Sequence, residues 1–146
     1  EPWVLYVQKR PREFLRDLGI PTTDVEQLMT NDAHAFFESK NDRDIYFEKM
    51  QSIRVNGRPL LYLEKDDRFE RKLFYRLDFF NELDSSAQIE FENRKLSFFD
   101  HFDRIVVRTG KHTQAGVAYC KGIEMPKRLH NHEVHGYILN HFQVPS

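Results

Sequence analysis

The sequence has little cysteine and no long apolar segment. Cys120 is the single cysteine among 146 residues, which excludes an internal disulfide and a zinc site built from cysteines. The apolar runs are only a few residues long, so no segment is expected to span a bilayer. Neither charge dominates, because 22 Lys and Arg face 23 Asp and Glu. The composition therefore predicts a single reduced, intracellular domain with no overall preference for anionic partners.

Sequence patterns that mark common enzyme classes are also missing. The chain has no nucleophile elbow and no glycine-rich phosphate loop. Cys120 follows the apolar residues of a predicted strand, where a buried and inert thiol is expected. The carboxylates show no spacing that sets them apart from a solvated surface. We therefore expect a protein that is not an enzyme and that needs no cofactor.

Aromatic residues are abundant. The chain contains 13 Phe, 6 Tyr and one Trp, which argues against disorder because large apolar groups offset the entropy of chain ordering. It begins with Glu1 and Pro2 rather than Met, so we expect a domain cut from a longer protein.

The first third of the chain has apolar spacings typical of helices. Phe14, Leu15 and Leu18 follow Pro11 at helical intervals and predict a first helix. A second helix is predicted over residues 22–29, and the polar residues 39–43 are predicted to be a loop.

Short strands are predicted from about residue 52 onwards. Asn56-Gly57 is a typical two-residue turn between residues 53–55 and 60–63, and Ser97 is expected to cap a short helix. Further strands are predicted at residues 72–79, 87–91, 95–98, 105–108, 116–120 and 133–139. This order predicts an α+β fold with a small OB-like antiparallel β-barrel.

The histidines of the C-terminal segment are the candidates for a metal site. In a strand, His130 and His132 would share one face, as a pair of metal ligands does. A barrel site would need another ligand on a later strand, and few residues follow. We therefore predict no metal and expect surface histidines.

Cations and rings alternate in two other segments. The sequence RKLFYRL at residues 71–77 places Lys72 and Arg76 beside Phe74 and Tyr75. Phe98, Phe99, His101, Phe102 and Arg104 form the second segment, and Lys111 follows in a polar loop. Proteins hold single-stranded nucleic acid with this combination, using cations for phosphates and ring faces for bases. The simpler interpretation is that most of these Phe residues fill the core.

The order of these features resembles the PAZ domain of Argonaute-family proteins. The similarity lies in the segments PREFL (11–15), YFEKMQSIRV (46–55), RKLFYRL (71–77), QIEF (88–91), KLSFFDHF (95–102), VAYCKG (117–122) and HNHEVHGYI (130–138). The resemblance implies one domain over residues 1–146. It would comprise a helical part (1–50), a barrel (51–86 and 104–140) and an inserted hairpin and helix (87–103).

The resemblance also implies a function in RNA silencing. PAZ domains hold the 3′ end of a single-stranded guide RNA, so the partners would be this RNA and the other Argonaute domains, in the cytoplasm or nucleus. The family's RNA-contacting Tyr and Arg fall on Tyr75 and Arg76, and its helix tyrosine falls on His101. Phe91 would stack on the terminal base and Arg104 would replace a basic residue. Strand alternation points Tyr75 and Arg76 to opposite faces, so both enter one pocket only if the strand bulges.

The sequence departs from the family after the short helix. The second tyrosine of the family pattern has no counterpart in residues 104–110, so the pocket is expected to be altered. This divergence is similar to that of outlying Argonautes of the kind expanded in nematodes. The alternative is a degenerate PAZ-like domain that serves as a protein-interaction or spacer module with little RNA affinity.

Overall fold

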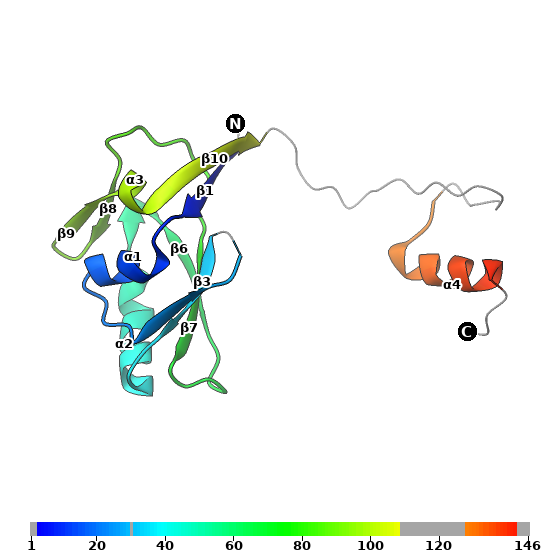
Figure 1. The fold of residues 1–146 in the computed structure, drawn as a ribbon, viewed down its shortest axis with the longest axis horizontal. Coiled ribbons are helices and arrows are strands. Elements are labelled where there is room, and N and C mark those ends of the chain that lie inside the picture. Colours follow the sequence, from blue (N-terminus) through cyan, green and yellow to red (C-terminus); the bar gives the residue numbers. More distant parts are fainter. Residues whose placement is uncertain (1–2, 30, 109–127, 143–146) are drawn as a thin grey trace. The chain divides into compact units, whose positions relative to one another are not determined.

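The computed structural model describes residues 3–29, 31–108 and 128–142, which belong to two units, residues 1–110 and 111–146 (Figure 1). In chain order the first unit contains β1 (Trp3–Gln8), α1 (Pro11–Asp17), β2 (Asp24–Gln27), β3 (Asp32–Phe36), α2 (Lys40–Met50), β4 (Arg54–Val55), β5 (Arg58–Pro59), β6 (Leu61–Lys65), β7 (Lys72–Leu77), β8 (Gln88–Phe91), β9 (Arg94–Ser97), α3 (Phe98–His101) and β10 (Phe102–Arg108). The described part of the second unit contains α4 (Asn131–His141). The predicted α+β class is confirmed.

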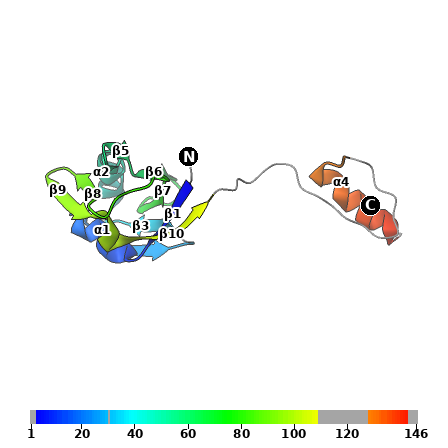
Figure 2. The same ribbon diagram turned by 90° about the horizontal axis from the view of Figure 1, so that it is seen from above.

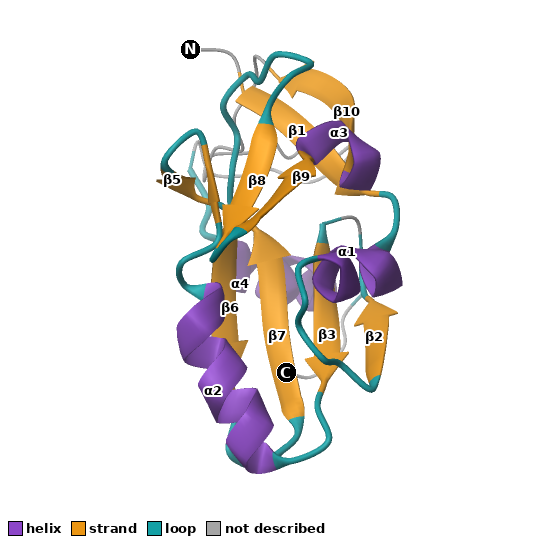
Figure 3. Cartoon of the chain, turned by 90° about the vertical axis from the view of Figure 1, so that its left-hand side faces the viewer, coloured by secondary structure: helices purple, strands orange, loops and turns teal. Residues whose placement is uncertain are grey.

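The strands of the first unit form three antiparallel sheets. β1 pairs with β10, four strands lie in the order β2-β3-β7-β6, and four more lie in the order β5-β4-β8-β9. Figure 2 shows β1 beside β10, and Figure 3 shows the order of the β2-β3-β7-β6 sheet. None of these sheets closes into a barrel within the described residues. Consecutive strands pair in β2-β3, β4-β5, β6-β7 and β8-β9, whereas the pairs β1-β10, β3-β7 and β4-β8 join segments far apart in the sequence.

The β2-β3-β7-β6 sheet has one apolar face and one polar face. Side chains at alternate positions are buried on the inner face, namely Val25, Ala33, Ala35, Leu61, Leu63, Leu73, Tyr75 and Leu77. They join a core that includes Phe14 and Leu15 of α1. This alternation follows from the two-residue period of a strand that is buried on one side only.

Three predictions concern the N-terminal part of the chain. The helix predicted after Pro11 is confirmed as α1. The helix predicted over residues 22–29 is wrong, because this segment contains β2, whose Val25 alone is buried and which pairs with β3. With β1, β2 and β3 in place, residues 1–50 are not a mainly helical part.

The loop predicted at residues 39–43 is also wrong. Ser39 is the N-cap of α2, and its Oγ accepts a hydrogen bond from the Asp42 backbone N–H at 3.1 Å. A polar segment can thus be the solvated first turn of a helix when a serine satisfies its free N–H groups.

The predicted turns in the middle of the chain are present. Asn56 and Gly57 both have positive φ angles, 49° and 73°, and connect the paired β4 and β5, as a type I′ turn requires. β8 and β9 form the predicted hairpin, and the one-turn helix α3 follows. Ser97 precedes α3, although its side chain makes no capping hydrogen bond.

The strand predicted at residues 133–139 is wrong, because this segment belongs to α4. The Glu133 carboxylate accepts a hydrogen bond from the His130 backbone N–H at 2.7 Å and so caps the helix start. Val134, Tyr137 and Ile138 recur at helical spacing. Among the described residues, no helix has the length and apolarity needed to cross a membrane. The strand predicted at residues 116–120 lies outside the described residues.

Candidate nucleic-acid interface

Strand β7 carries the basic and aromatic segment of the sequence, and alternation divides it between two faces. Leu73, Tyr75 and Leu77 are buried, whereas Lys72 and Phe74 are half-buried and Arg76 is exposed. The predicted separation of Tyr75 and Arg76 onto opposite faces is therefore confirmed. Lys72, Phe74 and Arg76 share the outer face of the sheet.

A row of rings crosses this outer face. The ring of Phe74 lies edge-on to His34 of β3, with centroids 6.0 Å apart, and to Tyr62 of β6, with centroids 6.4 Å apart. Phe36 extends the row along β3 at 6.4 Å from His34. The register explains the row, since His34 lies directly opposite Phe74. We call the outer face with these rings the sheet platform.

The cations of the sheet platform contact rings rather than carboxylates. The ammonium of Lys72 lies 3.8 Å from the ring centroid of Phe69, and the guanidinium of Arg76 lies 4.9 Å from that of Tyr62. Among the described residues, neither cation makes an ion pair. A cation–π contact attracts the cation to the ring face without neutralising its charge.

The carboxylates of the same face have partners within the chain. Glu26 lies 3.6 Å from His34 Nδ1, and Glu64 accepts a hydrogen bond from the Tyr62 hydroxyl at 3.1 Å. This bond is the main reason that the pKa of Tyr62 is raised. Asp32 accepts a hydrogen bond from the Met29 backbone N–H at 2.8 Å. The face thus combines engaged carboxylates with two cations, Lys72 and Arg76, that make no ion pair in the described part of the chain.

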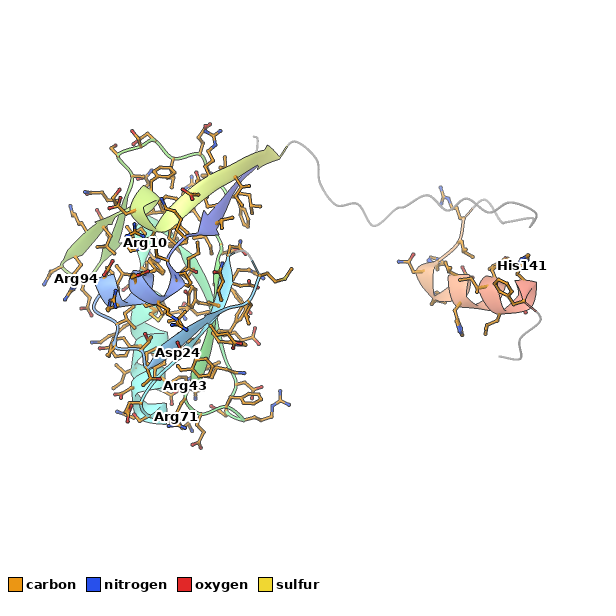
Figure 4. All side chains as sticks on the ribbon, viewed as in Figure 1. Arg10, Asp24, Arg43, Arg71, Arg94 and His141 are labelled. Carbon is orange, nitrogen blue, oxygen red and sulfur yellow. The ribbon has the colours of Figure 1, made fainter. Side chains whose placement is uncertain are left out.

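The loop between β6 and β7 is held by a buried arginine. The side chain of Arg43 on α2 is fully buried, and its Nη1 donates to the backbone carbonyls of Asp66, Phe69 and Lys72 at 3.3–3.4 Å (Figure 4). Its Nη2 donates to Asp67 Oδ1 at 3.1 Å. A guanidinium supplies enough donors in one plane to satisfy several carbonyls at once. Arg43 therefore fixes the loop that presents Phe69 to the sheet platform.

The structure places Tyr75 in the core. Its side chain is 1% exposed, and its hydroxyl pairs with the side-chain amide of Gln8, with Gln8 Nε2 donating at 2.8 Å. Burial raises the pKa of Tyr75 strongly, so the phenol stays neutral. The ring centroid lies 6.4 Å from that of Phe14. The hydroxyl of the Tyr75 side chain is thus occupied by another residue of the domain.

His101 is also buried beside Phe14. It is 3% exposed, its ring centroid lies 5.6 Å from that of Phe14, and its Nε2 lies 3.3 Å from Asp17 Oδ2. Its Nδ1 has no hydrogen-bond partner among the residues that the structure describes. Burial lowers the pKa of His101, and Asp17 opposes this effect only partly. The structure thus brings Tyr75 and His101 around the same ring, but in the interior.

The other predicted site residues lie apart. Phe91 of β8 is buried, at 2% exposure. Arg104 of β10 is exposed and pairs with Glu82 at 3.0 Å. Lys111 lies outside the described residues. Of the predicted residues, the structure brings Lys72 and Arg76 together on one surface, and it does not bring Phe91 or Arg104 to them.

Several residues of the sheet platform were not predicted as site residues from the sequence. These are His34, Phe36, Tyr62, Glu64 and Phe69. The signal for the first two was the strict alternation DAHAF at residues 32–36, in which two alanines face inward. LYLEK at residues 61–65 alternates in the same way. The pairing of β3 with β7 has no signal in the sequence, whereas β6 and β7 are consecutive strands joined by a short charged segment.

The described residues contain no group of three or more potential metal ligands. The rings of His130 and His132 are stacked, with centroids 5.5 Å apart, at the start of α4. None of the protein-family models, curated proteins or solved structures compared with the chain matches it. No comparison therefore identifies a PAZ domain.

Proposed function

We propose that this chain is a non-catalytic module that binds single-stranded RNA through the sheet platform. The observation that carries the proposal is the pairing of unneutralised cations with exposed rings on one face. Lys72 and Arg76 flank Phe74 on β7, and among the described residues neither has a carboxylate partner. Bases stack on ring faces and cations neutralise phosphates, so the arrangement suits a single strand.

The resemblance to PAZ domains supplies the wider part of the proposal. It implies RNA rather than DNA, a guide RNA held at its 3′ end, and a place within an Argonaute protein in RNA silencing. The resemblance also implies an OB-like barrel. This barrel stays part of the proposal, since none of the sheets closes within the described residues. Recognition of a 3′ end through Tyr75 and His101 would require both buried side chains to become accessible.

The second candidate is a protein-interaction module. The carboxylates on the outer face favour it, since Asp24, Glu26, Asp32 and Glu64 outnumber the two cations of β7 there. A protein partner can satisfy charges of both signs, whereas an RNA phosphate is repelled by carboxylates.

Fluorescence polarisation with a labelled single-stranded RNA octamer tests the proposal. Phe74→Ala removes a stacking surface worth about 1–3 kcal/mol, so we expect binding to weaken about 5- to 150-fold. Ile105→Ala is the matched control, because this exposed apolar residue lies on β10 in another sheet. Equal weakening by both variants would contradict a site on the sheet platform.

Salt dependence separates RNA from a protein partner. Replacing both Lys72 and Arg76 with Ala should reduce the slope of log affinity against log salt by about 1.4, the value for two phosphate contacts on a single strand. Lys95→Ala is the control, since Lys95 lies on β9 and pairs with Glu90. RNA affinity that is undetectable in low salt would favour the protein-interaction module.

A blocked 3′ end tests the narrower PAZ-like function. The sheet platform is an open surface, so we expect RNA with a free or a blocked 3′ end to bind equally. A strong preference for the free end would instead support a pocket at Tyr75 and His101.

A further inference from the structure

A hollow in the sheet platform has aromatic walls. It has a volume of about 310 Å³, and His34, Phe69 and Phe74 line it together with charged residues of β6, β7 and their loop. Phe69 is 50% exposed, so its ring is available to a ligand. A flat, apolar ligand of modest size can contact these rings.

Two of the four charged residues of the hollow are already engaged. Asp66 accepts hydrogen bonds from the Arg68 side chain, the shortest at 2.6 Å, and these bonds lower its pKa to about 2. Lys65 donates to Asp44 at 3.2 Å. Neither group is therefore free to select a ligand.

Glu64 and Lys72 are the remaining charged groups. Glu64 uses Oε2 to accept the Tyr62 hydroxyl, and among the described residues Oε1 has no partner. The ammonium of Lys72 lies over the ring of Phe69, and among the described residues it forms no ion pair within 4.0 Å. In the register, Glu64 lies opposite Phe74, and Lys72 is the next outward residue along β7. A base stacked on Phe74 would thus have a strong acceptor and a strong donor beside it.

We infer that this hollow selects a guanine base of the bound RNA. Guanine presents two adjacent donors, N1–H and the N2 amino group, which a carboxylate accepts together, and its O6 and N7 accept from an ammonium. Adenine and cytosine place a ring acceptor beside their amino group, and uracil flanks its single N–H with two carbonyls. These bases would direct a lone pair at Glu64. The inference rests on the proposed RNA binding.

The test uses the full chain and four labelled RNA octamers, namely oligo-U and oligo-U with one central G, A or C. We expect the G-containing octamer to bind about tenfold more tightly than the other three. Glu64→Gln should remove this preference, so that the four octamers bind this variant with affinities within about twofold of one another. Glu26→Gln is the control, because Glu26 lies on the same face but outside this hollow.

The possible outcomes separate the two proposals. Equal affinity for all four octamers would overturn the guanine inference and leave RNA binding intact. Loss of the G preference in Glu26→Gln to the same extent as in Glu64→Gln would also overturn the inference, because a general charge effect would explain it. No binding of any octamer would overturn both proposals.

Discussion

The cluster around Phe14 and the sheet platform use similar side chains for opposite purposes. In the cluster, Tyr75 and His101 are buried beside Phe14, and the Tyr75 hydroxyl is occupied by Gln8. On the platform, Phe74 meets its neighbouring rings edge-on, and the cations lie over rings. The same strand, β7, supplies both regions. Ring chemistry alone therefore does not distinguish core from surface; the direction in which each side chain points does.

The largest expected difference between the two regions is in stability. Phe102 is 1% exposed, with its ring stacked on Phe98 at 4.8 Å, so Phe102→Ala should lower the free energy of unfolding by about 3–5 kcal/mol. Phe74→Ala removes a half-buried ring and should cost much less. Chemical denaturation of both variants measures the difference. A greater loss in Phe74→Ala than in Phe102→Ala would show that core and surface are assigned the wrong way round.

A smaller effect is expected at Arg43, which links the interior to the sheet platform. Arg43→Met removes the guanidinium donor from three backbone carbonyls, of which those of Asp66 and Phe69 keep a backbone N–H donor, and should cost about 1–3 kcal/mol. RNA binding should also weaken, since the loop that carries Phe69 is no longer fixed. Denaturation and polarisation measurements on the same samples check both effects. Arg43→Lys, which keeps the charge but supplies fewer directed donors, should lie between Arg43→Met and the unaltered chain. Full stability and full RNA binding in Arg43→Met would contradict this role.

The smallest expected effect concerns pH and the interior. Burial lowers the pKa of His101 below its ordinary value of 6.5 in the folded chain, whereas the unfolded chain keeps that value. The unfolded state therefore binds more protons as the pH falls through 6.5. As the pH falls, this extra proton binding by the unfolded chain lowers the free energy of unfolding. The loss ends once the pH is below the pKa of His101 in the folded chain, because both states are then protonated.

His101→Phe removes the titrating group and keeps a ring beside Phe14. Denaturation at pH 7.5, 6.5 and 5.5 should show a loss of stability in the unaltered chain that is smaller in the variant. The same pH dependence in both proteins would mean that His101 does not titrate differently on folding.

Local signals in the sequence predicted many elements of the fold. The Asn56-Gly57 turn, the helix after Pro11 and the hairpin at β8 and β9 depend on neighbouring residues, and all three are present. The wrong predictions concern segments whose sequence is compatible with either a helix or a strand. Residues 24–27 became a strand because β3 lies beside them, and residues 133–139 became helical with a cap from Glu133.

The candidate site was predictable only in part. The alternation of cations and rings at residues 71–77 identified Lys72, Phe74 and Arg76 and separated Arg76 from Tyr75. His34 comes from β3, 40 positions before Phe74, so only strand pairing brings these two rings together, whereas Tyr62 lies on β6, the strand that directly precedes β7. The burial of His101 likewise depends on its contact with Phe14, which is 87 positions away in the sequence.

The sequence by itself determined the α+β class, the turns and the alternation of the β7 side chains between two opposite faces, because these depend on local backbone geometry and a period of two. Only the tertiary structure decided that Tyr75, Phe91 and His101 belong to the interior and that His34, Tyr62 and Phe74 form one surface. Burial and cross-strand contact depend on which distant segments pack together, and the free energy of that packing is shared over the whole core.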